Sequence, residues 1–196
     1  MTKVFFNFNS EVVKILKRGG AGVMPTDTIY GIVGSAMSRK TVARIYRLRK
    51  RRPDKPMIIL INSFSVLKIF GIVPDAQTKK LLKRFWPGKV SVILRVKSHE
   101  SKIKLKYLHR GTNSLAFRLP KPYWLRKLLA KTGPLVAPSA NLEGKTPATT
   151  IKEAQKYFGA KADFYVDAGK LIGVPSAIVA FRSGKALFLR KGANGK

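Results

Sequence analysis

Apolar and polar residues alternate along this chain in blocks whose lengths distinguish strands from helices. Short apolar runs are typical of strands in a sheet, and we expect strands at 4–6, 21–26, 57–61, 89–96, 114–120, 134–141, 163–169, 176–181 and 186–190. Longer segments with apolar residues at helical spacing separate them, and we expect helices at 10–20, 38–50, 63–71, 75–86, 121–133 and 149–159. Interleaved in this way, the elements predict an α/β fold with a twisted mixed sheet flanked by helices.

Capping residues suggest where some of these helices begin and end. Ser10 and Ser38 are expected to begin the first two, and Arg52 with Pro53 to end the second. The lysine-rich segment 97–113 has no clear period, so we expect a basic loop or hairpin there. This segment is the best candidate for a mobile element or an RNA contact.

Composition changes the picture mainly through charge. Forty Lys and Arg oppose nine Asp and Glu, a formal net charge of +31, which favours nucleic acid or another phosphate-rich partner. We find no internal repeat, no signal-peptide pattern and no apolar run of the roughly 20 residues that span a bilayer. With no cysteine, disulfides and thiolate metal sites are excluded. A single cytoplasmic domain, 1–196, with no membrane contact is expected.

Several common catalytic sites have no counterpart in the sequence. The two histidines, His99 and His109, both lie in the segment 97–113 and lack the spacing of a zinc-binding helix. Neither a P-loop nor a dinucleotide-binding glycine motif is present, and carboxylates are scarce.

What remains is a set of small polar turns and basic residues near the ends of predicted strands, where ligands gather in open α/β sheets. The set comprises PTDTIYG (25–31), RKRRPDKP (49–56), SLAFRLP (114–120), PSAN (138–141), Ser176 and LRKG (189–192). Hydroxyls and cations of this kind bind phosphates and carboxylates, so the set suits an anionic small molecule such as a nucleotide. Taken singly, each is also compatible with an ordinary turn, a helix cap or a solvated helix end.

Over about 19–192, the chain resembles the YrdC-type threonylcarbamoyl-adenylate synthase family. The resemblance rests on five motifs taken in this order: PTDTIYG, the K/R-x-R-x-x-x-K-P stretch, FRLP, PSAN and LRKG. The resemblance implies a YrdC-like domain of the single-domain form, with a large, positively charged concave cavity. It implies a nucleotidyltransferase that condenses L-threonine, bicarbonate and ATP to threonylcarbamoyl-AMP and pyrophosphate with Mg²⁺, for modification of an adenosine in tRNA. The reaction has two steps: threonine and bicarbonate form a carbamate, and the carbamate attacks the α-phosphate of ATP. Neither step needs an enzyme nucleophile, because positioning and charge neutralisation suffice.

The resemblance also implies roles for particular residues. Threonine would be held by Thr28, Tyr30, Arg118, the backbone of Ala137, and Ser176. ATP would be held by Arg51, Lys55, Ser114, Ser139, Asn141 and Arg190. Catalysis would rest on Arg51, Lys55 and Arg118, and Asp27 would be an outer contact of Mg²⁺.

The sequence departs from the family pattern at four positions. Ala177 and Ala180 replace a threonine and an acid in a strand that often reads STVVD, Glu143 stands where serine is common, and Leu60 stands where some members place a histidine. Two alternatives follow: a non-catalytic RNA-binding or RNA-processing member, or a paralogue that carbamoylates or adenylates another substrate. RNA, as tRNA or double-stranded RNA, and proteins of the tRNA-modification pathway are the expected macromolecular partners.

Overall fold

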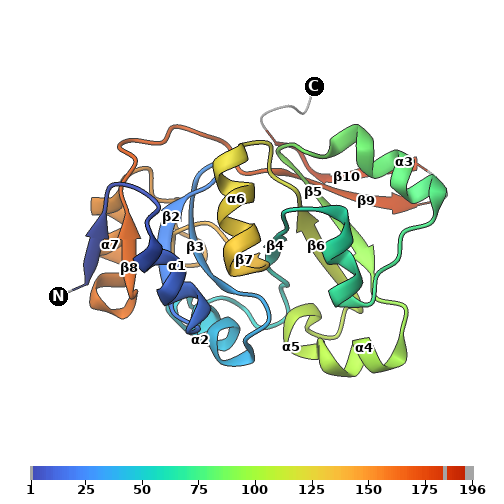
Figure 1. Ribbon diagram of the computed structural model, residues 1–196, viewed down its shortest axis with the longest axis horizontal. Coiled ribbons are helices and arrows are strands. Elements are labelled where there is room, and N and C mark those ends of the chain that lie inside the picture. The colour runs from blue at the N-terminus through green and yellow to red at the C-terminus, as the bar shows by residue number, and fades with distance from the viewer. Residues whose placement is uncertain (1, 183–184, 193–196) are drawn as a thin grey trace.

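The computed structural model describes residues 2–182 and 185–192, and in this part of the chain ten strands form one sheet (Figure 1). From edge to edge the strands are β1 (Lys3–Phe5), β8 (Phe164–Val166), β2 (Ala21–Pro25), β3 (Tyr30–Ser35), β7 (Leu135–Val136), β4 (Ile58–Leu60), β6 (Ser114–Arg118), β5 (Val90–Arg95), β9 (Ala177–Arg182) and β10 (Lys185–Arg190). Parallel pairs such as β4 with β6 occur beside antiparallel pairs such as β2 with β3, which confirms the mixed sheet. The expected domain 1–196 includes 1, 183–184 and 193–196, which lie outside the described residues.

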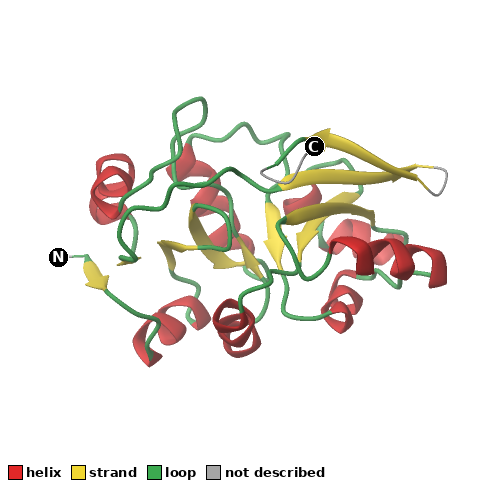
Figure 2. Cartoon of the chain, turned by 90° about the horizontal axis from the view of Figure 1, so that it is seen from above, coloured by secondary structure: helices red, strands yellow, loops and turns green. Residues whose placement is uncertain are grey.

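Helices lie on both sides of the strands (Figure 2). They are α1 (Ser10–Lys17), α2 (Arg39–Arg49), α3 (Ala76–Phe85), α4 (His99–Lys104), α5 (Lys106–His109), α6 (Tyr123–Thr132) and α7 (Ile151–Phe158), with 3₁₀ helices η1 (Phe64–Phe70) and η2 (Gly159–Lys161). Within the described residues, none of these helices combines the length and the apolar character needed to cross a bilayer.

Alternation along the strands builds a core on each face of the sheet. In β2, Met24 packs with Leu16 of α1 and Leu129 of α6, whereas its neighbour Val23 belongs to the core that contains Ile45 of α2. Successive residues of a strand point to opposite faces, so a strand buried on both faces reads as a continuous apolar run. This is why the short apolar runs located most of the strands.

Two of the residues predicted to begin or end helices act differently in the structure. Asn9, not Ser10, caps α1, because its side chain accepts a hydrogen bond from the backbone N–H of Val12 at 3.1 Å. Ser38 caps α2 as predicted, but this helix ends at Arg49, with Lys50 in the left-handed conformation at φ 48°. The helix therefore ends before Arg52 and Pro53, where its end was predicted.

The prediction of a loop or hairpin at 97–113 is wrong. The segment forms the two short helices α4 and α5, and Leu105, Leu108 and His109 are buried. Its lysines obscured the helical spacing of these buried residues. The His109 ring is bonded to the backbone, with Nε2 at 2.7 Å from the carbonyl oxygen of Lys102 and Nδ1 accepting from the N–H of Gly111 at 3.1 Å.

Candidate functional site

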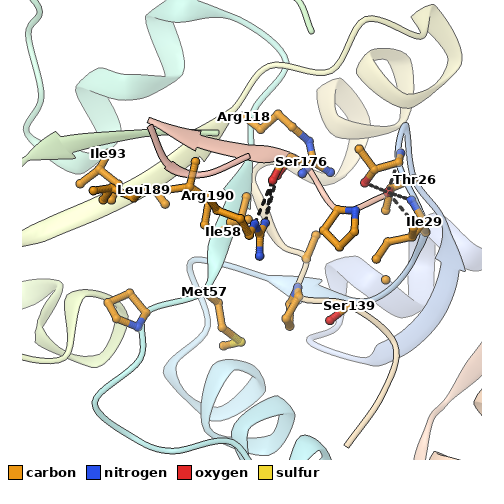
Figure 3. A pocket seen from close by; sticks show the side chains of 18 of the residues that line it. Thr26, Ile29, Met57, Ile58, Ile93, Arg118, Ser139, Ser176, Leu189 and Arg190 are labelled. Atoms are coloured by element: carbon orange, nitrogen blue, oxygen red, sulfur yellow. Dashed lines mark hydrogen bonds between the residues drawn. The ribbon is translucent and has the colours of Figure 1, made fainter. Parts of the chain in front are cut away.

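A cavity of about 500 Å³ lies among β3, β5, β6, β9 and β10 and the turns that follow β2 and β7 (Figure 3). Nine of the residues singled out from the sequence line it: Thr28, Tyr30, Arg51, Ser114, Arg118, Ala137, Ser139, Ser176 and Arg190. The structure therefore gathers motifs that are spread over more than 160 residues of the chain into a single cavity.

Backbone hydrogen bonds join the PTDTIYG and PSAN motifs. The N–H of Ile32 donates to the carbonyl of Pro138, and the N–H of Ala140 donates to the carbonyl of Tyr30, both at 3.0 Å. A side chain at Gly31 would place its Cβ 3.3 Å from the Pro138 oxygen, so glycine permits this close approach. The two motifs thus form one continuous wall of the cavity.

Thr26 fixes the turn that presents Thr28. Its hydroxyl donates to the carbonyl of Ile29 at 2.7 Å and accepts from the N–H of Thr28 at 3.2 Å. The two threonine hydroxyl oxygens lie 3.1 Å apart. The motif is therefore an ordinary turn stabilised by a hydroxyl, which is one of the two interpretations that the sequence allowed. The same turn also places Thr28 in the cavity lining, as the other interpretation predicts.

Tyr30 is among the residues that line the cavity, and its hydroxyl is hydrogen-bonded to the backbone of another segment. The hydroxyl donates to the carbonyl of Gly169 at 2.8 Å and accepts from the N–H of Ala168 at 2.9 Å. Burial raises the pKa of this phenol, which keeps it a neutral donor. Tyr30 therefore ties β3 to the turn after β8 and shapes the wall.

Arg118 and Asp27 form a buried ion pair beneath the cavity. Arg118 Nη2 lies 2.9 Å from Asp27 Oδ1, and the side chains are 3% and 1% exposed. Burial lowers the pKa of Arg118, and the Asp27 carboxylate acts in the opposite direction. Among the described residues no aligned hydrogen bond reaches either Asp27 oxygen or Arg118 Nε, so this cavity-lining guanidinium keeps a free donor.

Ser176 and Arg190 meet on the side of the cavity formed by β9 and β10 (Figure 3). Arg190 donates from Nε and Nη2 to the Ser176 carbonyl at 3.0 and 2.8 Å, and the Ser176 hydroxyl lies 2.9 Å from that of buried Ser91. Burial, followed by repulsion from Arg118 and Arg51, lowers the pKa of Arg190. A bound anion would relieve this repulsion between like charges.

Arg49 also lines the cavity, although it was not singled out from the sequence as a site residue. Its side chain is buried, at 3% exposure. Nε donates to the backbone carbonyl of Asn141 and Nη2 donates to Asn141 Oδ1, both at 3.0 Å, and Nη2 also donates to the Ser139 hydroxyl at 3.2 Å. Nη1 has no partner among the described residues. Burial, and then repulsion from Arg51, lowers the pKa of Arg49 to about 10. The sequence did hold a signal, because Arg49 continues the buried stripe of Val42, Ile45 and Tyr46 on α2.

The structure places Asn141 and Lys55 outside the cavity lining. Asn141 holds Arg49 and donates from Nδ2 to the carbonyls of Leu142 and Lys145, both at 2.7 Å, so its amide is committed to the protein. Lys55 lies on the surface, where Nζ is 2.8 Å from Glu143 Oε1. Glu143, a departure from the family pattern, also accepts from the N–H of Arg52. It therefore connects the PSAN turn to the 52–55 loop.

This connection is expected to make stability depend on pH. The Lys55 ammonium, and then the Arg52 N–H, lower the pKa of Glu143 from its ordinary 4.5 to about 2. A depressed carboxyl pKa stabilises the fold above pH 4.5, and this stabilisation is lost as the pH falls toward 2. Glu143→Gln should therefore cost at most about 1 kcal/mol above pH 5, since Lys55 is half exposed. Denaturant unfolding should show that difference shrinking below pH 4.5, and a difference unchanged down to pH 2 would contradict the assignment.

Apolar side chains line the cavity beside the arginines and include Met57, Ile58, Ile93, Ile178 and Leu189. Of the departures at 60, 177 and 180, Ala180 alone lines the cavity. Leu60 and Ala177 are buried, and Leu60 packs in the core under α1 and α6. Leu60 therefore does not contribute to the cavity lining of this chain.

The described residues contain no group of three or more His, Asp or Glu side chains arranged to hold a metal ion. Asp27 is paired with Arg118 and is not in the cavity lining. These residues do not fit a protein-held Mg²⁺ site, because hard cations need several oxygen ligands.

Comparisons with known proteins agree with this geometry. The family model Sua5_yciO_yrdC, described as telomere recombination, matches residues 14–192. A threonylcarbamoyl-AMP synthase of Pyrococcus abyssi is 30% identical over 179 residues, which cover 90% of this chain and 52% of that protein. One from Neisseria meningitidis is 30% identical over 176 residues, covering 88% and 90%. The chain thus spans about half of the archaeal relative and most of the bacterial one.

Solved structures share the fold. P. abyssi Sua5 complexed with L-threonine matches with a TM-score of 0.84 at 28% identity, over 98% of this chain and 57% of that one. Escherichia coli YciO matches with a TM-score of 0.83 over 100% of this chain and 98% of that one, at 22% identity, which supports the fold alone.

Proposed function

We propose, since this chain belongs to the Sua5/YciO/YrdC family, that it condenses L-threonine, bicarbonate and ATP to threonylcarbamoyl-AMP, pyrophosphate and water. The observation that carries the proposal is the convergence of four arginines on one cavity: Arg49, Arg51, Arg118 and Arg190. Thr28, Ser139 and Ser176 belong to the same lining, in which the described residues include no Asp or Glu. Such a cavity suits two anions bound side by side.

The chemistry needs little from the protein beyond this arrangement. The threonine nitrogen attacks the carbon of bicarbonate, a carbamate forms, and one bicarbonate oxygen leaves as water. If bicarbonate first dehydrates to CO₂, the water leaves in that step, and the nitrogen loses a proton to solvent when it attacks CO₂. A carbamate oxygen then attacks the α-phosphorus of ATP, and pyrophosphate leaves. Holding two anions in contact and neutralising the charge on the phosphates lowers both barriers.

The arginines and hydroxyls are assigned by their surroundings. Arg118, with its free Nε, would receive the threonine carboxylate, and Thr28 and Ser176 would bind beside it. Arg49, which lines the cavity and whose Nη1 has no partner among the described residues, would contact the triphosphate together with Arg51, whose Nε and Nη2 are fixed by the carbonyls of Lys55 and Pro56 at 3.0 and 2.9 Å. Mg²⁺ would enter with ATP as part of the substrate, held by the phosphates. The product would serve threonylcarbamoylation of an adenosine in tRNA.

The test is pyrophosphate release that requires both threonine and bicarbonate. We expect release from ATP only when both are present, with threonylcarbamoyl-AMP identified by mass spectrometry. Release that is unchanged without bicarbonate would contradict the carbamate step. Folded protein that releases no pyrophosphate with either co-substrate would contradict the activity itself, and a response to another amino acid in place of threonine would favour a paralogous substrate.

A further inference from the structure

His109 is a buried histidine that the proposed chemistry does not use, although the turn that follows it reaches the cavity. It is 3% exposed, and it is not among the described residues that line the cavity. It ends α5, which contacts α2 and β6. Thr112 and Ser114, shortly after it in the chain, do line the cavity. The chain therefore passes from the buried ring to the cavity wall within a few residues.

The backbone of the turn 110–113 is in a conformation that needs support from other groups. Arg110 and Asn113 have φ angles of 54° and 53°, and Gly111 has a φ angle of 94°. These values lie in the left-handed region, which residues other than glycine occupy at an energetic cost. Contacts outside the turn are therefore needed to keep it in this one conformation.

The His109 ring supplies such contacts. Its Nε2 lies 2.7 Å from the carbonyl oxygen of Lys102 in α4, so Nε2 carries the proton and Nδ1 is an acceptor. Nδ1 accepts from the N–H of Gly111 at 3.1 Å and from the N–H of Asn113 at 3.4 Å. Only the neutral ring with its proton on Nε2 makes all three contacts. The ring thus ties two N–H groups of the turn to α4.

The backbone carbonyl of His109 holds Thr112 and, through it, Ser114. The carbonyl accepts from the N–H of Thr112 at 2.9 Å and from the Thr112 hydroxyl at 2.7 Å. The same hydroxyl accepts from the N–H of Ser114 at 3.3 Å, and the Ser114 hydroxyl donates to the Thr112 carbonyl at 3.3 Å. Thr112 is exposed and Ser114 is half-buried, so this hydroxyl pair, Thr112 and Ser114, lies at the opening of the cavity. Its position depends on the turn that His109 orders.

The hydroxyl pair lies at the end of the cavity away from Arg118. Ser114, Ala116 and Arg118 alternate along β6 and all line the cavity, so they point to the same face of the strand. Four residues of extended strand separate Ser114 from Arg118 by about 13 Å. A threonine carboxylate bound at Arg118 leaves the Ser114 end to the second substrate, ATP. Ile93, which pairs with Ala116 between β5 and β6, gives this end an apolar surface that suits a nucleobase.

We propose that His109 is a positioning residue for ATP: its ring orders the turn 110–113, and the turn sets the hydroxyl pair at the nucleotide end of the cavity. The inference rests on the proposed function, because it takes ATP as the occupant of that end. It assigns His109 no contact with substrate and no proton transfer. Disturbing the ring should therefore weaken ATP binding and leave threonine binding and kcat little changed.

Two substitutions of His109 separate the two sides of its ring. His109→Asn keeps an acceptor near the position of Nδ1 and loses the contact to Lys102, whereas His109→Gln reaches the position of Nε2 and loses that acceptor. The Kd of ATP, measured by calorimetry without threonine, should rise about five- to tenfold in His109→Gln and less than about twofold in His109→Asn. The KM of threonine should be unchanged in both. Equal ATP affinities in the wild type and both folded variants would overturn the proposal, as would an equal loss in both.

A second pair of variants tests the turn without changing the buried ring. Gly111→Ala places a side chain at a φ of 94°, where no described atom outside the neighbouring residues lies within 4 Å of the new Cβ, so it strains the turn without a clash. Gly133→Ala is the matched control, since Gly133 follows α6 at a φ of 78° with equally open space and is not among the described residues that line the cavity. We expect ATP to bind about three- to tenfold more weakly to Gly111→Ala than to Gly133→Ala. Equal affinities in this pair would overturn the proposal.

ATP binding and pyrophosphate release distinguish failure of this inference from failure of the proposed activity. Wild-type rates of threonine-dependent release, with ATP affinity unaffected by His109→Gln and Gly111→Ala, would overturn the role of His109 alone. The expected pattern of ATP affinities in protein that releases no pyrophosphate would support the role of His109 and contradict the activity. Wild-type protein that binds no ATP would overturn both.

Discussion

Arg118→Ala should lose both the proposed activity and much of the stability of the fold. Removing Arg118 leaves the Asp27 carboxylate, which is 1% exposed, without its counter-ion. Breaking a buried ion pair by deleting one partner costs about 3–5 kcal/mol. The lost contact to an anionic substrate should reduce kcat/KM by a further factor of about 10 to 100 in the protein that remains folded. Denaturant unfolding and threonine-dependent pyrophosphate release measure the two effects separately.

A second variant separates the structural role of Arg118 from its role toward substrate. Asp27→Asn/Arg118→Met removes both charges and retains most of the side-chain volume, so it should recover much of the lost stability. Activity should remain as low as in Arg118→Ala, because the guanidinium that faces the cavity is still absent. Wild-type rates in this double variant would show that Arg118 only supports the wall.

Most of the fold could be predicted because the strands are apolar runs buried on both faces. Two examples are β2, which lies between β8 and β3, and β4, which lies between β7 and β6. The order of the strands could not be read from the sequence, since it depends on pairings between segments far apart in the chain. α4 and α5 were missed for another reason: their buried faces are only a few residues long and lie among lysines, so periodicity is hard to detect in such short helices.

The motifs that form the candidate site could be predicted from the sequence. The direction in which each of their side chains points could not. Lys55 and Asn141 belong to recognisable motifs, yet Lys55 pairs with Glu143 and Asn141 holds Arg49. The 49–56 stretch was a candidate in which Arg51 and Lys55 were given roles and Arg49 was given none, and taken singly the stretch was also compatible with a solvated helix end that favours the helix dipole. The position of Arg49 on the buried stripe of α2 argues against that interpretation, and the structure shows it in the cavity lining.

Arg49→Met is expected to reduce kcat/KM by about 10- to 100-fold. Its Nη1 has no partner among the described residues, and Arg49 shares the cavity lining with Arg51, Arg118 and Arg190, so an anion is the partner that its surroundings favour. Methionine fills much of the same space without the charge, but it leaves the buried oxygens of Asn141 without their donor, so the free energy of unfolding should fall by about 1–3 kcal/mol. Initial rates over a range of ATP concentrations measure the effect, and unfolding curves check that the variant is folded.

Lys55→Gln is the matched comparison, because it removes one charge from the same motif on the surface side. Lys55 is 48% exposed and lies outside the cavity lining, so this change should lower kcat/KM less than about threefold. Asn141→Ala should resemble Arg49→Met in direction but be smaller, since it removes one of the two Asn141 oxygens that orient the guanidinium, Oδ1, and leaves the backbone carbonyl. A large loss in Lys55→Gln together with near-normal rates in Arg49→Met would reverse the assignment. The triphosphate would then lie against the 52–55 loop, outside the cavity that the four arginines surround.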